Sequence, residues 1–170
     1  KFYLFFPGIL PYINTRINFR NHRKIVVIDG NIGYVGGFNV GDEYINRGEQ
    51  FKYWRDTHIR IQGEAVNELN KRFILDWDYA SEGELKSYDE YFISQEVNGD
   101  IGIQIISSGP DHKEEFIKNA YMKIINNAKK KVYIQTPYLV LDEPMKEALK
   151  ISALSGVDVR IMVPGKPDHF

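Results

Sequence analysis

Short apolar runs with the composition of β-strands alternate along the chain with longer segments of helical periodicity. In the first half, three segments have the β-branched content or the apolar alternation of strands: residues 24–29, 32–35 and 56–61. From residue 64 to residue 79, apolar side chains recur every three to four positions, which predicts an amphipathic helix. The first half is therefore expected to form strands that pack against one helix.

The second half repeats the alternation of strand and helix. Strands are predicted at three segments: residues 101–106, 132–135 and 157–163. A long helix is predicted at residues 116–128, and another begins at Asp142, a favourable N-cap, with Pro144 in its first turn. A strand, a helix and a strand in succession predict a parallel pair with a right-handed crossover. The fold class is therefore α/β, and we expect a mixed β-sheet flanked by helices.

An acidic, irregular stretch at residues 81–100 has the composition of a connector. We therefore expect residues 1–80 to belong to one lobe and residues 101–170 to the next. The apolar run at residues 2–10 is broken by Pro7 and Gly8, so no segment is predicted to cross a bilayer. The chain starts at Lys1 without an initiator methionine, and we interpret it as a soluble fragment excised from a longer protein.

Charge and cysteine content exclude several classes of protein. The 22 basic and 23 acidic residues give a net charge of −1, so no global positive field attracts nucleic acid or an acidic membrane. The absence of cysteine excludes disulfides and thiolate metal sites. Any anion binding must therefore depend on a local group of side chains.

One pattern has a specific spacing, H-x-K-x4-D-x6-G-G-x-N. It consists of His22, Lys24, Asp29, Gly36-Gly37 and Asn39. At average residue usage, six fixed positions would be met by chance with a probability of about 10⁻⁸ per start position. The pattern is therefore a strong signal, whereas H-x-K alone would carry no information.

The residue types of this pattern suit phosphate chemistry. Residues two apart on a strand share a face, so His22 and Lys24 are expected to project together. An imidazole beside a fixed ammonium is a nucleophile next to an anion clamp. Asn39, which we expect a turn at the glycine pair to deliver, can donate its amide to another phosphate oxygen. Asp29 has the opposite parity to His22, which favours a structural role at the end of the strand.

The pattern resembles the motif of the phospholipase D superfamily, and its flanks are similar to bacterial cardiolipin synthases over essentially the whole chain. These flanks are N-F-R-N at 18–21, V-G-D-E-Y at 40–44, W-R-D-T-H at 54–58 and Q-T-P-Y at 135–138. The resemblance implies an incomplete phospholipase D/nuclease-like fold. It also implies transfer of a phosphatidyl group between two phosphatidylglycerol molecules, which gives cardiolipin and glycerol.

The same resemblance implies a role for each matching residue. His22, Lys24 and Asp29 match the catalytic motif, in which one histidine forms a phosphohistidine and a partner histidine handles the proton. Asp56 matches the downstream acid that orients a motif histidine, and Asn39 matches a substrate-binding position. No metal or other cofactor is implied. The expected partners are phosphatidylglycerol and other anionic phospholipids at the bacterial cell membrane, reached through segments outside this chain, and no nucleic acid.

The chain departs from the family pattern because residues 101–170 contain no second H-x-K. His112 is followed by Lys113, and His169 is followed by Phe170. We therefore expect the isolated chain to be inactive, unless two copies combine their single motifs in a homodimer. Each half holds a portion of a lobe that the other half lacks, so we also predict that residues 24–29 and 132–135 share one sheet. That sheet would form within one chain or by a swap between two copies.

Several alternatives stay open from the sequence alone. The parent enzyme could hydrolyse phosphodiesters, as phospholipases and nucleases do, or the chain could be a silent anion-binding domain. Asp56 could instead cap a turn or pair with Arg55 or Arg60. The basic residues near the motif suit either lipid headgroups or solvation of a loop: Arg16, Arg20, Arg23 and Lys24. The other histidines, His58, His112 and His169, are expected to be solvated or locally hydrogen-bonded.

Overall fold

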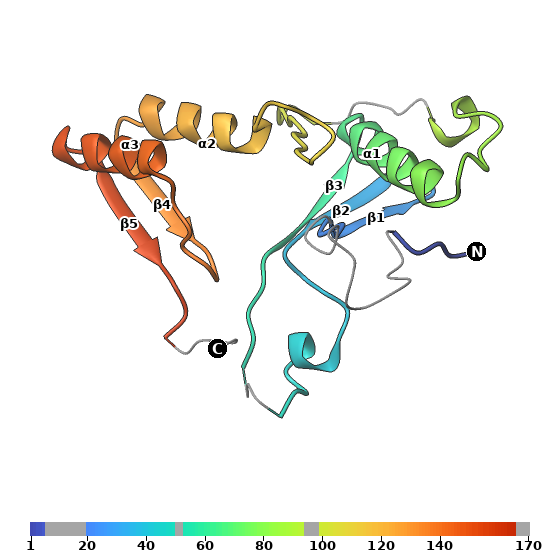
Figure 1. The fold of residues 1–170 in the computed structure, drawn as a ribbon, viewed down its shortest axis with the longest axis horizontal. Helices are drawn as coiled ribbons and strands as arrows, with labels where there is room; N and C mark the ends of the chain where they lie inside the picture. Colours follow the sequence, from blue (N-terminus) through green and yellow to red (C-terminus); the bar gives the residue numbers. More distant parts are fainter. Residues whose placement is uncertain (6–19, 50–52, 94–98, 166–170) are drawn as a thin grey trace. The chain divides into compact units, whose positions relative to one another are not determined.

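The computed structural model describes residues 1–5, 20–49, 53–93 and 99–165. Contacts between Cα atoms divide the chain into two units, Lys1–Ile105 and Ile106–Phe170, and each unit has its own apolar core. Each unit contains a β-sheet with helical structure packed against it (Figure 1).

The first unit contains a three-stranded antiparallel sheet in the order β1-β2-β3. Its strands are β1 (Ile25–Ile28), β2 (Ile32–Gly36) and β3 (His58–Gln62). Asp29 and Gly30 link the first two strands with φ angles of 52° and 64°, and the Asn31 amide donates to the Ile28 carbonyl over 3.0 Å. An Asp-Gly pair tolerates this left-handed backbone better than most residues do, which explains why the hairpin turns here. Between β2 and β3 the chain makes a long excursion that includes the 3-10 helix η2 (Asp42–Ile45).

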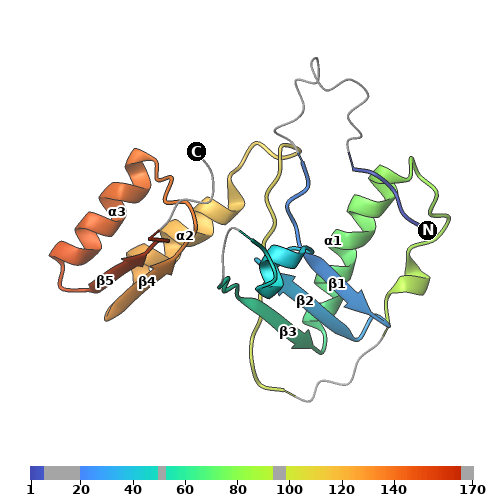
Figure 2. The same cartoon turned by 90° about the horizontal axis from the view of Figure 1, so that it is seen from below.

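Helix α1 (Ala65–Ala80) covers one face of this sheet, as Figures 1 and 2 show. Its buried Val66 and Leu69 pack against Ile61 of β3 to form the core of the unit. Gly33 makes the close approach possible, because a Cβ atom there would lie 2.8 Å from a methyl carbon of Leu69. Alternate residues of β1 face away from this core, and Val26 is accordingly 51% exposed.

The segment after α1 is attached to the first unit by buried and half-buried amides. It includes the 3-10 helix η3 (Asp89–Tyr91). The buried side chain of Asn70 donates to the Tyr91 carbonyl over 2.5 Å, and Asn67 donates to the Ile93 carbonyl over 3.3 Å. Much of the stretch expected to be a connector therefore lies against α1, and the division between the units falls just beyond it.

The second unit consists of α2 (Phe116–Asn127), β4 (Lys131–Gln135), α3 (Glu143–Leu154) and β5 (Asp158–Met162). The two strands are parallel and α3 connects them, which confirms the predicted strand-helix-strand arrangement. Asp142 is the N-cap of α3, because its carboxylate accepts the Met145 amide over 3.1 Å. The core of the unit is formed by residues from α2, β4, α3 and the loop before β5: Ile125, Val132, Ala148, Leu149 and Val157.

Two predictions about the sheets are wrong. Residues 101–106 form no strand; instead Ile105 packs against the core of the first unit. The described strands also form two separate sheets, one antiparallel and one parallel, rather than one mixed sheet. The segments at 24–29 and 132–135 therefore do not share a sheet within one chain. Each unit buries its own apolar cluster, so no shared sheet is needed for either core to form. A swap between two copies stays a prediction.

Candidate functional site

The register of the first sheet places four of the candidate site residues in segments that leave one end of the sheet. Ile25 at the start of β1 pairs with Val35 near the end of β2, and Val35 pairs with Ile59 near the start of β3. The residues just before β1, just after β2 and just before β3 therefore leave the same end of the sheet. His22, Lys24, Asn39 and Asp56 belong to these three segments. Segments far apart in the sequence thus leave the sheet at the same end because the sheet is antiparallel.

His22 and Lys24 lie immediately before β1, which begins at Ile25 rather than at the predicted residue 24. The His22 side chain is exposed and Lys24 is half-buried. The Lys24 ammonium donates a hydrogen bond to the His22 carbonyl oxygen over 2.8 Å. An ammonium has three donors, so this bond leaves two that can bind an anion.

The glycine pair makes room for the first residues of β3. Gly36 is the last residue of β2 and pairs with His58, so it is part of the sheet rather than the expected turn. A Cβ atom at Gly36 would lie 2.4 Å from the Thr57 carbonyl oxygen and 2.6 Å from the His58 Cα. A Cβ atom at Gly37 would lie 2.2 Å from an Asp56 carboxylate oxygen. Glycine at both positions therefore brings Asp56 against the chain that leads to Asn39.

Asp56 is exposed and accepts a hydrogen bond from the Trp54 indole nitrogen over 3.1 Å. Neither Arg55 nor Arg60 is the partner in this contact, and the Arg60 guanidinium donates to Gln62 over 3.3 Å. Its place beside Gly37 puts its carboxylate at the motif end of the sheet. The role of Asp56 in orienting a histidine stays a prediction.

Asn39 and Asp29 lie at different ends of the hairpin. Asn39 is half-buried, three residues beyond the end of β2 at the motif end. Asp29 is exposed in the turn between β1 and β2, seven positions from His22 and thus roughly 20 Å along an extended chain. The left-handed backbone of Asp29 is consistent with a structural role at the end of the strand, which its position relative to His22 in the strand pattern predicted.

The sequence did not indicate the environment of His58. Its ring contacts those of Tyr34 and Phe38, with centroid distances of 6.5 and 6.3 Å. Its Nδ1 atom is buried and has no hydrogen-bond partner among the described residues, while the side chain as a whole is half-buried. Strand parity could have placed it, since His58 and Arg60 alternate with Ile59 and Ile61. His169 lies outside the described residues.

A second feature that the sequence did not indicate lies beside the motif. Asp76 of α1 accepts hydrogen bonds from the side chains of Asn21 and Arg23, the two residues that flank His22. Arg23 therefore does not simply solvate a loop, whereas Arg20 is exposed and Arg16 lies outside the described residues. The only local hint was the i,i+4 spacing of Arg72 and Asp76, which also form an ion pair.

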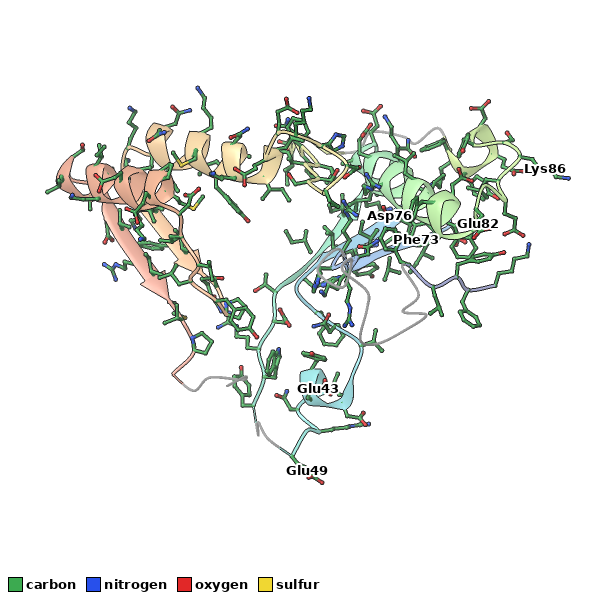
Figure 3. The ribbon with its side chains drawn as sticks, in the orientation of Figure 1. Glu43, Glu49, Phe73, Asp76, Glu82 and Lys86 are labelled. Carbon is green, nitrogen blue, oxygen red and sulfur yellow. The ribbon has the colours of Figure 1, made fainter. Side chains whose placement is uncertain are left out.

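Two pockets lie along β1, with volumes of about 180 and 490 Å³. Both are lined by Ile25 and Phe73, and neither is lined by His22 or Lys24. Figure 3 labels Phe73 and Asp76 on α1, above the sheet. His22 and Lys24 therefore lie outside the lining of both pockets, whereas Asp29 lines the larger one.

Comparison with known proteins agrees with the resemblance seen in the motif. Residues 121–170 match the family described as "Cardiolipin synthase, PLD-like domain". A cardiolipin synthase of Clostridium perfringens (strain SM101) is 57% identical over 173 residues, which cover 99% of this chain and 36% of that protein. The chain is a relative of the cardiolipin synthases. One from Staphylococcus aureus (strain Mu50) is 59% identical over 97% of this chain and 34% of its own length.

The similarity to cardiolipin synthases covers only part of the length of those proteins. The chain spans about a third of the curated relatives that it matches. No solved structure matches the chain. Within the described residues, every helix is too short or too polar to cross a membrane.

Proposed function

We propose that this chain is part of a phospholipase D-type phosphatidyltransferase that joins two phosphatidylglycerol molecules into cardiolipin and releases glycerol. The observation that carries the proposal is the exposed His22 next to Lys24, with Asn39 and Asp56 leaving the same end of the sheet. The identity of 57–59% with cardiolipin synthases over nearly the whole chain supports it.

In the first proposed step, a ring nitrogen of His22 attacks the phosphorus of phosphatidylglycerol. The new N–P bond replaces the bond between phosphorus and the glycerol oxygen, and the glycerol leaves with a proton from a general acid. In the second step, a hydroxyl group of another phosphatidylglycerol attacks the same phosphorus. The N–P bond breaks, the hydroxyl proton passes to the group that acted as the acid, and cardiolipin is released.

The residues of this chain supply nucleophile and charge stabilisation in both steps. The Lys24 ammonium and the Asn39 amide bind the non-bridging phosphate oxygens, whose negative charge grows in the transition state. Asp56 orients the His22 ring. The general acid comes from a second motif that this chain does not contain, and the parent protein meets its lipids at the bacterial membrane through other segments.

Substitution of His22 and Lys24 in the full-length protein tests this proposal. His22→Ala is expected to abolish cardiolipin formation from phosphatidylglycerol vesicles, because no phosphohistidine can form. Lys24→Ala should leave a weak activity, since one of several contacts to the phosphoryl oxygens is lost. Arg60→Ala, on the same strand as His58 but engaged only with Gln62 in the described structure, is a matched surface control. Cardiolipin formation by His22→Ala at the wild-type rate would exclude this mechanism.

The missing acid gives a second test of the same proposal. The isolated 170-residue chain should release neither cardiolipin nor phosphatidic acid at a steady rate, because positioned proton transfer contributes about 10²- to 10⁴-fold. Turnover that rises with the square of the chain concentration would indicate that two copies combine their motifs in a homodimer. Turnover linear in concentration, with phosphatidic acid as product, would instead support a hydrolase that needs one motif.

A further inference from the structure

Asp76 of α1 joins the helix to the segment that carries His22. Its carboxylate accepts a hydrogen bond from the Asn21 amide over 3.0 Å and from the Arg23 guanidinium over 3.2 and 3.3 Å. Arg72, one helical turn earlier, forms an ion pair with the same carboxylate. The Asp76 side chain is only 12% exposed, compared with 24% for Arg23, so these contacts are largely shielded from water. Figure 3 shows Asp76 on the underside of α1.

These contacts hold the chain on both sides of His22. The Asn21 side chain also accepts the Arg23 backbone amide over 2.9 Å, which closes a turn around His22. On the other side, the Lys24 ammonium donates to the His22 carbonyl over 2.8 Å. The ladder of β1 begins only at Ile25, so sheet hydrogen bonds do not fix residues 21–24. The exposed imidazole is therefore attached to a backbone whose position depends on Asp76.

We infer that Asp76 is a positioning residue for catalysis, which fixes the His22 backbone so that its ring points at the phosphorus. This inference rests on the proposed role of His22 as the nucleophile. A catalytic group displaced by about 1 Å can cost on the order of 10²-fold in rate, even though substrate still binds. Loss of the Asp76 contacts should consequently lower kcat and leave KM nearly unchanged, because the carboxylate is already engaged by Asn21, Arg23 and Arg72.

A merely structural role would give a different result, and Asp78 provides the matched control. Asp78 lies two positions further along α1 and accepts a hydrogen bond from the Tyr88 hydroxyl over 2.8 Å and from the Leu85 amide over 3.4 Å. Neither partner belongs to the motif segment. Asp76→Asn and Asp78→Asn make the same chemical change on the same helix, and only the first alters the contacts of Asn21 and Arg23.

The experiment measures kcat, KM and unfolding temperature of the full-length protein with phosphatidylglycerol in mixed micelles. Asp76→Asn is expected to lower kcat about 10- to 100-fold with KM changed less than about twofold. Asp78→Asn should leave kcat within about twofold of the wild type, even if its unfolding temperature falls. An Asp76→Asn protein with wild-type kcat would overturn the inference, as would an equal loss of kcat in Asp78→Asn.

A double-mutant cycle with Arg23→Gln extends the test to the contact itself. If Arg23 and Asp76 act on His22 through their shared contact, the double variant should lose no more kcat than the worse single variant. If the two kcat losses multiply in the double variant, Arg23 and Asp76 act independently, which would contradict a role through their shared contact. Should Asp76→Asn not fold, Arg23→Gln and Asn21→Ala carry the same kcat and KM prediction. His22→Ala separates the two hypotheses, because an inactive His22→Ala beside a fully active Asp76→Asn refutes only the positioning role.

Discussion

Substitution of Gly36 by alanine tests whether the close approach of β2 and β3 holds the motif end of the sheet together. The new Cβ atom would lie 2.4 Å from the Thr57 carbonyl oxygen and 2.6 Å from the His58 Cα, both of them backbone atoms. Ordinary contact begins at about 3.4 Å, so the strands must separate by about 1 Å. No side-chain rotation can relieve this clash.

The expected loss of stability has two parts. Overpacking a well-packed position typically costs about 1–3 kcal/mol. Separation of the strands also weakens the hydrogen bond from the Gly37 amide to the Thr57 carbonyl, which is 3.0 Å long, and such a bond contributes about 1 kcal/mol. Gly36→Ala should therefore lower the free energy of unfolding of the first unit by about 2–4 kcal/mol.

Urea denaturation followed by tryptophan fluorescence measures this loss. Both tryptophans of the chain, Trp54 and Trp77, lie in the first unit, so the signal reports on that unit. Gly102→Ala is the control, because a Cβ atom there meets nothing within 4 Å. Gly37→Ala should cost less than Gly36→Ala, since the atom it meets is the end of the exposed Asp56 side chain. A Gly36→Ala midpoint equal to that of Gly102→Ala would show that the two strands are not in this close contact.

Two further predictions concern the cores and the cap of α3. Leu69→Ala should lower the free energy of unfolding of the first unit by about 2–5 kcal/mol because Leu69 is 1% exposed, whereas Leu75→Ala on the same helix, at 47% exposure, should cost about 0.5 kcal/mol or less in the same urea assay. The Lys118 ammonium, and then the Met145 amide, hold the pKa of Asp142 below its ordinary value. Asp142 therefore stabilises the second unit above its unfolded pKa of about 4 and loses this effect as the pH falls through its lower folded pKa. We therefore expect amide hydrogen exchange in α3 to be faster in Asp142→Ala than in the wild type at pH 7, and the two exchange rates to converge in acid. A difference that persists at pH 2 would contradict this prediction.

The order and type of most elements followed from the sequence because their causes are local. The Asp-Gly turn ends β1, and the apolar period of residues 64–79 predicted α1 to within one residue at each end. The N-cap Asp142 set the start of α3. The candidate catalytic residues were likewise identified by spacing, because His22 and Lys24 are two positions apart and the pattern continues to Asn39.

Features that depend on contacts between residues far apart in the sequence became visible only in the tertiary structure. Residues 101–106 have the composition of a strand, yet a strand needs a neighbouring backbone, and Ile105 instead packs against the first core. The glycine pair was expected to form a turn, but Gly36 instead allows the close approach of β3, which begins 22 positions later at His58. The link from Asp76 to Arg23 spans 53 positions, and no local pattern encodes it. Hydrogen-bonded ladders and shielded ion pairs depend on which surfaces the fold brings together, and this is why the residue types alone did not reveal them.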